Sequence, residues 1–310
     1  MLICKKLGNI VNILHQDKCP LCGKNHLEKS MTCTDHYATG ESFDLFRCTD
    51  CGFLFTQDVP VEAEIGRYYE SPDYISHTDT QKGLMNRVYH HVRKYMLSSK
   101  ARLVRVKSGL QQGRLLDIGT GTGYFAHTMQ TKGWQVSAIE KSPQARQFAK
   151  QHFSLDVKAP EALPVLPAEE FDVVTLWHVM EHLEHLNETW DILYRILKQN
   201  GTLIIAVPNP TSYDAQKYKE MWAAYDVPRH LWHFSPSAIQ QFGAKHGFIL
   251  EERHPMPFDA FYVSMLTEKY KKHSLFFMRG LFTGMQALLA SFVKKDRSSS
   301  IIYIFRKKKV

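Results

Sequence analysis

One stretch, residues 113–125 with the sequence GRLLDIGTGTGYF, constrains the fold more than any other part of the chain. Leu115, Leu116 and Ile118 form a short apolar run typical of a buried parallel strand, and alternating glycines follow it. Glycine has no Cβ, so a turn built from it lets a ligand approach the backbone closely. The residues after the turn predict a helix, whose first N–H groups would point at that ligand.

The spacing of this loop distinguishes two kinds of nucleotide-binding protein. A nicotinamide-binding fingerprint has the order G-x-G-x-x-G, whereas here the order is D-x-G-x-G-x-G, starting at Asp117. A second carboxylate, Glu140, ends the next strand-like run. Together these features resemble the class I S-adenosylmethionine-dependent methyltransferases, and the likeness extends from about residue 113 to the C-terminus.

The resemblance implies S-adenosylmethionine as the cofactor. Asp117 and the glycine loop are expected to support its methionine end, and Glu140 to accept two hydrogen bonds from the ribose hydroxyls. Loss of that pair of hydrogen bonds would cost on the order of 2 to 3 kcal/mol. The alternative roles are a turn cap for Asp117 and a surface charge for Glu140. The full predicted cofactor site is Asp117, Gly119, Thr120, Gly121, Gly123, Tyr124, Glu140, Glu161, Ala162 and Trp177.

The alternation of strand and helix patterns after residue 113 predicts an α/β fold with a doubly wound, Rossmann-like sheet. The resemblance implies seven strands in the order 3-2-1-4-5-7-6, with the last strand antiparallel. The expected strands are 114–118, 135–140, 154–158, 171–177, 202–207, 248–252 and 300–306. The expected helices lie near 122–132, 143–152, 187–199 and 236–246.

Near the N-terminus, two C-x-x-C-G motifs bring four cysteines together: Cys19, Cys22, Cys48 and Cys51. Four thiolates in two such pairs suit a closed, tetrahedral and therefore structural Zn²⁺ site. The segment looks like a small Cys4 zinc ribbon. Two disulfides are the alternative for these cysteines, and iron could use the same four ligands.

We expect three regions, namely a zinc ribbon at 1–60, a linker and helical cap at 61–112, and the methyltransferase domain at 113–310 with an insertion at about 256–298. Helical spacing of apolar residues from Leu84 to Val106 predicts the cap helix. By analogy with the family, the cap would cover the cofactor and substrate cleft. Tyr69, Tyr74 and His77 would either line that cleft or pack the linker.

Histidines supply the candidate catalytic residues. His178, Glu181 and His182 would share one face if their segment were helical. Some members of the family carry Glu-x-x-Glu-His here and bind a divalent metal, whereas His-x-x-Glu-His also occurs in metal-free members. This predicts a catalytic role for His178, with His178, Glu181 and His182 as a second metal site in the alternative. A neutral imidazole can act as a base, and we expect His230 to be that base, or with His233 to pack a loop.

The insertion contains an apolar stretch, 273–293, bracketed by cations at 269–272 and 294–297. Such a segment could contact an anionic membrane surface through residues 273–297, or receive a lipidic substrate. The alternative is a helix or helical hairpin that covers the cleft and buries its own apolar face. No signal sequence and no run of 18 uncharged apolar residues is evident, so we expect a cytoplasmic protein without a spanning helix.

The formal net charge of +8 comes mainly from residues 266–310, which hold 11 basic and 2 acidic residues. The ribbon itself is nearly neutral, which argues against a nucleic-acid partner. The sequence therefore favours a methyltransferase acting on a small-molecule, sugar-linked or lipid-linked acceptor. The alternatives are an RNA or protein methyltransferase that holds its substrate through the ribbon, and a non-catalytic cofactor-binding module. A nicotinamide-dependent oxidoreductase is a more distant alternative.

Overall fold

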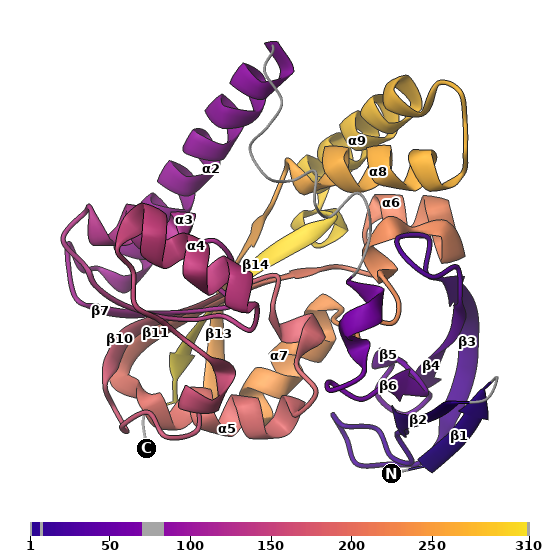
Figure 1. The fold of residues 1–310 in the computed structure, drawn as a ribbon, viewed down its shortest axis with the longest axis horizontal. Coiled ribbons are helices and arrows are strands. Elements are labelled where there is room, and N and C mark those ends of the chain that lie inside the picture. Colours follow the sequence, from indigo (N-terminus) through magenta and orange to yellow (C-terminus); the bar gives the residue numbers. More distant parts are fainter. Residues whose placement is uncertain (1, 7–8, 70–83, 309–310) are drawn as a thin grey trace.

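A seven-stranded sheet forms the centre of the computed structural model, which describes residues 2–6, 9–69 and 84–308 (Figure 1). Its order, β13-β14-β11-β10-β7-β8-β9, is the predicted order 3-2-1-4-5-7-6 read from the opposite edge. Strand β14 is antiparallel to both of its neighbours, β13 and β11. The other five strands, β11, β10, β7, β8 and β9, are parallel to one another. The predicted fold class is therefore confirmed. The strands are β7 (Arg114–Ile118), β8 (Gln135–Ile139), β9 (Val157–Lys158), β10 (Phe171–Trp177), β11 (Leu197–Pro208), β13 (Phe248–Pro255) and β14 (Ser300–Lys307).

Helices cover both faces of this sheet (Figure 1). On one face, α2 (Leu84–Ser108) and α3 (Tyr124–Gln130) bury apolar side chains against β7, β10 and β11, with α4 (Pro143–Phe153) beside α3. On the other face, α5 (Leu186–Ile196) and α7 (Pro236–Lys245) pack through Trp190 and Phe242. Helix α7 starts as predicted, because the Ser235 hydroxyl accepts a hydrogen bond from the Ala238 N–H and proline occupies the first turn.

The N-terminal region contains two small sheets. The first comprises β1 (Leu2–Lys6), β2 (Asn9–Leu14) and β6 (Val59–Pro60); the second comprises β3 (Leu27–Thr34), β4 (Ser42–Cys48), β5 (Leu54–Thr56) and β12 (Trp232–His233). Strand β12 comes from the second half of the chain and pairs antiparallel with β5. Phe53 and Phe55 lie in the same buried cluster as Trp232, Phe234 and Phe242. The cysteine-bearing region and the large sheet thus share one apolar core.

The insertion before the last strand forms a helical hairpin of α8 (Asp259–Tyr270) and α9 (Phe276–Val293), next to the short helix α6 (Tyr213–Tyr218) (Figure 1). The expectation that this hairpin buries its own apolar face is wrong, because the large apolar residues of α9 are exposed. Among the described residues α9 is also long and apolar enough to cross a membrane, judged only by length and composition, and 28% of it is buried. Arg279 lies within this helix, so it is no run of 18 uncharged residues, and the absence of a spanning helix stays a prediction.

Candidate functional site

The loop after β7 has the left-handed backbone that its glycines predicted. The φ angles of Gly119, Gly121 and Gly123 are 68°, 56° and 84°, a region that other residues adopt only at a cost. A Cβ on Gly119 would lie 2.3 Å from a methyl group of Val179, and one on Gly123 would lie 3.0 Å from Leu155. A Cβ on Gly121 would meet nothing within 4 Å, so the loop is open on that side.

Two carboxylates stand at the ends of adjacent strands beside this loop. Asp117 is 1% exposed and accepts a hydrogen bond of 2.7 Å from the Thr175 hydroxyl on β10. The two oxygens of Glu140 accept hydrogen bonds of 2.8 Å from the Gly121 and Ser142 amides. Glu140 therefore fixes both the glycine loop and the start of α4. The carboxyl ends of parallel strands are where ligands of such sheets bind.

One lysine beside the predicted cofactor site, Lys100, was not predicted from the sequence. Lys100, on α2, places its ammonium group 4.4 Å from the ring centre of Trp177. Burial lowers the pKa of Lys100, and the charges of Asp259 and Asp117 oppose this effect. Burial also raises the pKa of Asp117 to about 6, against the hydrogen bond from Thr175 and the charge of Lys100. The sequence signal for Lys100 is its position on the apolar side of the predicted helix, next to Ala101 and Val104, where a cation is unexpected.

These residues have the donor and acceptor groups that S-adenosylmethionine needs. Glu140 presents acceptors for hydroxyl groups, Asp117 is an acceptor for a cationic amine, and the loop is open at Gly121. The Trp177 Nε1–H is buried and has no hydrogen-bond partner among the described residues, which leaves a donor for a ligand.

The remaining predicted residues surround the same edge of the sheet. The Thr120 N–H donates to the Ile139 carbonyl oxygen, and Tyr124 lies under the Arg93 guanidinium of α2, 4.1 Å from its ring centre. Glu161 and Ala162 form a 3-10 turn directly after β9. The cofactor-binding roles assigned to these residues stay predictions.

The motif that begins at His178 does not form the α-helix on which its residues would share a face. His178 has a left-handed backbone with φ 58°, and only 180–182 form a 3-10 turn. Its ring lies between two carboxylates, with Nδ1 3.4 Å from Glu181 and Nε2 3.0 Å from Asp259. Although burial opposes it, the neighbouring carboxylates of Asp259 and Glu181 raise the pKa of His178 to about 10. His178 is therefore cationic at neutral pH and is no base there.

Two histidines, His182 and His230, form a cluster with Glu181. Ligand atoms of Glu181, His182 and His230 lie within 4.8 Å of one another. The Nδ1–H groups of His182 and His230 each donate 2.9 Å hydrogen bonds to the carbonyl oxygens of Arg229 and Ala224. Both Nε2 atoms therefore keep a lone pair for a proton or a metal. Both Glu181 oxygens are buried without a hydrogen bond among the described residues.

This cluster differs from the metal site suggested by the sequence, because His230 takes the place given to His178. Burial and the charge of His230 lower the pKa of His182 to about 4, so His182 is neutral at pH 7. The Tyr69 hydroxyl lies 3.5 Å from His182 Nδ1, while Tyr74 and His77 lie outside the described residues. The distance of 48 residues between His182 and His230 explains why spacing alone could not join them.

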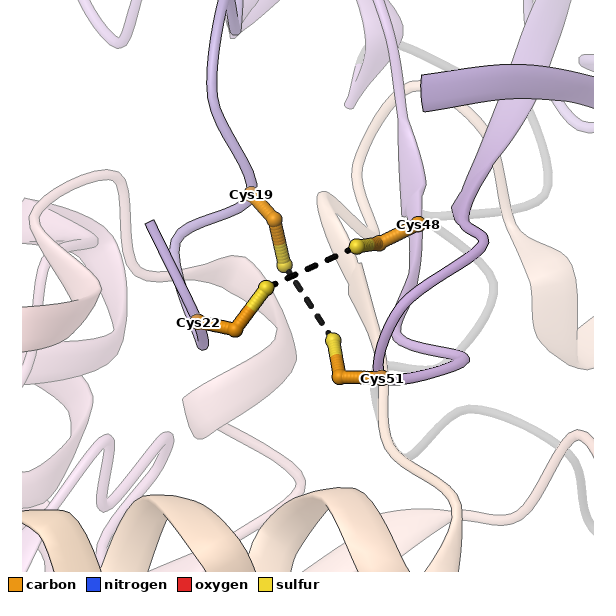
Figure 2. Close-up of side chains that lie close together, drawn as sticks. All are labelled: Cys19, Cys22, Cys48 and Cys51. Carbon is orange, nitrogen blue, oxygen red and sulfur yellow. Dashed lines mark hydrogen bonds between the residues drawn. The ribbon is translucent and has the colours of Figure 1, made fainter. Parts of the chain in front are cut away.

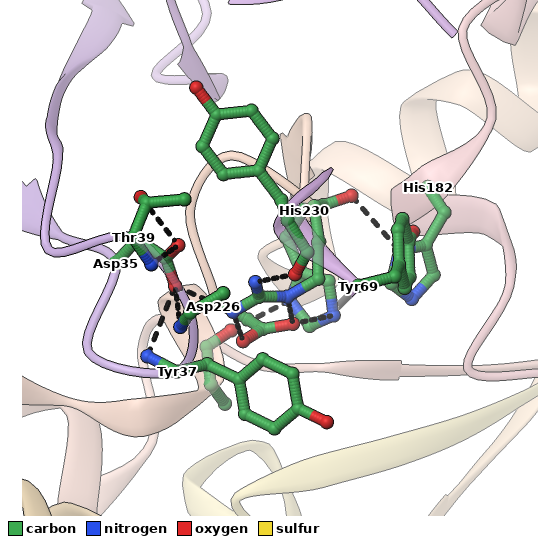
Figure 3. A network of polar contacts seen from close by, with 11 residues as sticks. Asp35, Tyr37, Thr39, Tyr69, His182, Asp226 and His230 are labelled. Atoms are coloured by element: carbon green, nitrogen blue, oxygen red, sulfur yellow. Dashed lines mark hydrogen bonds and ion pairs between the residues drawn. The ribbon is translucent and has the colours of Figure 1, made fainter. Parts of the chain in front are cut away.

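A buried arginine, Arg229, ties the segment that carries His230 to the N-terminal region. Figure 3 shows Asp35, Asp226 and His230 of this network. Arg229 donates to both oxygens of Asp226 at 2.6 and 2.9 Å, and to Asp35 at 3.1 Å. Asp226 in turn lies 3.9 Å from His230 Nε2. His233 has a different place, because its Nε2 contacts the Thr56 hydroxyl of β5 at 3.0 Å and burial lowers its pKa to about 3.

The four cysteines converge as their spacing predicted (Figure 2). The Sγ atoms of Cys19 and Cys51 are 3.5 Å apart, and those of Cys22 and Cys48 are 3.6 Å apart. These separations are too long for disulfides and approach the roughly 3.8 Å edge of a tetrahedron with Zn–S bonds of about 2.3 Å. Gly23 and Gly52, which follow the two cysteine pairs, both have a left-handed backbone conformation.

Comparisons with known proteins agree with this geometry. The family described as "Methyltransferase domain" matches residues 88–252, more than half of the chain. The chain belongs to this family, the class I S-adenosylmethionine-dependent methyltransferases.

Several curated relatives carry the name ubiquinone biosynthesis O-methyltransferase. The mitochondrial protein of Schizosaccharomyces pombe is 29% identical over 134 residues, covering 41% of this chain and 49% of that protein. The protein of Alkalilimnicola ehrlichii is 31% identical over 115 residues, covering 34% and 46%. The chain thus spans about half the length of the curated relatives it matches. A solved structure of a putative sarcosine dimethylglycine methyltransferase from Galdieria sulphuraria is 14% identical, with a TM-score of 0.49, covering 70% of this chain and 86% of that one.

Proposed function

We propose that this protein transfers a methyl group from S-adenosylmethionine to a hydroxyl oxygen of a small-molecule acceptor. The observation that carries the proposal is the cluster of Glu181, His182 and His230, which lies beyond β10, the strand next to the glycine loop. Its two imidazoles have their Nδ1 atoms engaged and their Nε2 atoms available. A hydroxyl must lose a proton as it is methylated, and such nitrogens can take it.

S-adenosylmethionine supplies a methyl group on a cationic sulfur, so the chain mainly has to align the acceptor and exclude water. In this proposal Glu140 and Asp117 hold the cofactor. His230 Nε2 accepts the acceptor's proton, and Asp226, 3.9 Å away, stabilises the imidazolium that forms. The cationic His178 balances the charges of Glu181 and Asp259 and holds the segment after β10 against the start of α8.

A structural zinc belongs to the proposal, and a divalent cation at the histidine cluster is the alternative to His230 as the base, because a metal-bound Nε2 would have no lone pair for a proton. Four cysteines in tetrahedral contact fit a structural Zn²⁺. Glu181, His182 and His230 fit a divalent cation, because two nitrogens and a carboxylate are a common ligand set and the Nδ1–H groups are anchored by carbonyls. Such an ion would supply Lewis acidity toward an acceptor oxygen.

The test is an acceptor screen with the full chain and S-adenosylmethionine, in which S-adenosylhomocysteine formation is measured on phenols, sugars and lipid-linked hydroxyl compounds. We expect His230→Ala to lower kcat by about 10²-fold to 10³-fold while the Kd for S-adenosylmethionine stays unchanged. His185→Ala is the matched control, because His185 follows His182 by three residues but is exposed and caps nothing with its side chain.

Comparing rates after removal of loosely bound metal, with and without added Mn²⁺, separates the two roles of the cluster. A rate that depends on Mn²⁺ supports the cation, and an unaffected rate supports His230 as the base. Full activity of the His230→Ala variant in both conditions would contradict the proposal.

A further inference from the structure

The outer face of the α8–α9 hairpin is apolar over the whole length of α9. Phe282, Phe292 and Val293 are 64%, 74% and 90% exposed. Monomeric soluble proteins seldom expose a continuous apolar surface of this kind. We call it the apolar face, and its exposed members are Leu275, Phe276, Phe277, Met278, Leu281, Phe282, Met285, Leu289, Phe292 and Val293.

The side of α9 that packs on α8 carries small residues instead. Its buried positions are Gly280, Thr283, Gly284, Ala287 and Ser291. A Cβ on Gly280 would lie 2.5 Å from the Met265 Cα, and one on Gly284 would lie 2.8 Å from the Phe261 Cα. A helix of a soluble protein normally turns its large apolar residues inward. Small residues between helices, with large apolar residues outside, are the arrangement of helix pairs in lipid.

Exposed cations stand at both ends of the apolar face. Lys271 and Lys272 lie in the turn before α9, and Lys294 and Lys295 follow its last residue. The acidic residues of the hairpin region already have cationic partners. Glu268 pairs with Arg279, Asp296 with Arg253 and Asp259 with His178.

A cavity of about 450 Å³ opens beside the apolar face. Its polar lining includes Lys217, Lys271, Arg279 and the Glu268 carboxylate that is paired with Arg279, and its apolar lining includes Leu275, Met278 and Phe282. Such a lining suits an anionic group that is attached to an apolar chain.

We propose that the α8–α9 hairpin docks on an anionic membrane surface, with the apolar face in the boundary between headgroups and acyl chains. The 18 residues of α9 extend about 27 Å, but one side of the helix packs on α8 and its Arg279 is paired with Glu268 of α8 near the turn of the hairpin. A helix lying in the plane of the membrane keeps this pair at the headgroup level. In this orientation the exposed lysines at both ends of the apolar face can bind anionic headgroups. The inference is independent of the acceptor that the enzyme methylates.

The test is flotation of the full chain with lipid vesicles. We expect binding to phosphatidylcholine vesicles that contain about 30% phosphatidylglycerol, and much weaker binding to phosphatidylcholine alone or in high salt. The double variant Phe282→Ser and Phe292→Ser should bind at least about tenfold more weakly, since two large apolar side chains are lost. Replacing Lys294 and Lys295 by Gln should weaken binding about fivefold for each cation removed.

Val165→Ser is the matched control, because Val165 is apolar and 79% exposed but lies outside the hairpin. It should bind vesicles as the native chain does. S-adenosylmethionine titration of every variant establishes that the fold is intact. No vesicle binding by the native chain overturns the proposal, as does unchanged binding of the double Ser variant. A native dimer that the double Ser variant dissociates, without vesicle binding, would assign the apolar face to a second copy of the chain.

Discussion

Asp117 shows how one buried side chain can make cofactor binding depend on pH. It sits at the end of the central strand with 1% exposure, and burial raises the pKa of its carboxyl to about 6. In the absence of ligand, ionisation of Asp117 therefore lowers the free energy of unfolding as the pH rises from about 4 to about 6. A cationic ligand beside the carboxylate reverses this preference, because it favours the charged form.

We therefore expect the affinity for S-adenosylmethionine to fall below pH 6, by up to about tenfold for each pH unit. In Asp117→Asn the affinity should be lower and nearly independent of pH between 5 and 8. Calorimetric titrations across this range measure both effects. Asp156→Asn is the control, because Asp156 is an exposed carboxylate outside the site and should leave the native profile unchanged. A flat profile in the native chain would remove Asp117 from the cofactor site.

At the scale of elements, the segment before α7 links the N-terminal region to the cluster of Glu181, His182 and His230. Asp35 accepts hydrogen bonds from the Tyr37, Ala38 and Thr39 amides, so its own loop holds it rigidly. Through Arg229 this rigidity reaches Asp226 and hence His230 (Figure 3). We infer that Arg229 is a positioning residue for His230 and has no contact with the acceptor.

Arg229→Lys tests that role, because lysine cannot form the two-pronged contact with Asp226. We expect kcat to fall about tenfold, equivalent to about 1.4 kcal/mol, with the S-adenosylmethionine Kd unchanged. Arg67→Lys, at an exposed ion pair with Glu41, should behave as the native chain. A parallel loss of cofactor affinity would indicate general misfolding instead.

The elements of the large sheet could be predicted because each has a local cause. Apolar run length defined β7 and β10 to the residue, and the Ser-Pro pair defined the start of α7. Strand β11 begins at Leu197, five residues before the expected start, because Leu197 pairs with Phe171 across the sheet. That contact depends on tertiary structure and leaves no trace in the local pattern.

The site was only partly predictable for the same reason. The glycine loop and Glu140 are close in sequence, whereas Lys100, Asp259 and Asp226 reach the site from separate elements. The orientation of α9 has a local cause in the sequence, namely the spacing of its small residues. The spacing Gly280-x-x-x-Gly284-x-x-Ala287 marks the face that packs on another helix and so predicts that the large apolar residues point away from it.

At the scale of the whole molecule, the N-terminal region and the large sheet share one apolar core. We therefore expect the stability of the large sheet to depend on the cysteine cluster. Cys19 and Cys48 belong to the same buried cluster as Trp190 and Trp232. A structural zinc contributes about 10 kcal/mol or more to folding, which is comparable with the total stability of a domain. Loss of the metal should therefore not be confined to the N-terminal region.

We expect Cys48→Ser to reduce the zinc content well below one ion per chain and to lower the thermal midpoint by more than about 10 °C. Unfolding should remain a single transition, followed by tryptophan fluorescence. Zinc is measured by elemental analysis. Cys33→Ala serves as the control, because Cys33 is buried but lies outside the cluster, so its loss should leave the zinc content intact. A stable, active Cys48→Ser chain without zinc would contradict the structural role.

The pairing of β5 with β12 also has a consequence for biosynthesis. Strand β5 (54–56) pairs with residues 232–233, which are translated much later. Most of the chain must therefore be synthesised before the four-stranded sheet can be completed. Until then β5 is an open edge that carries Phe55, and such edges pair with other chains. Contacts between distant segments also slow folding. A ribosome-bound chain that stops before residue 232 should therefore depend on chaperones far more than one that includes it.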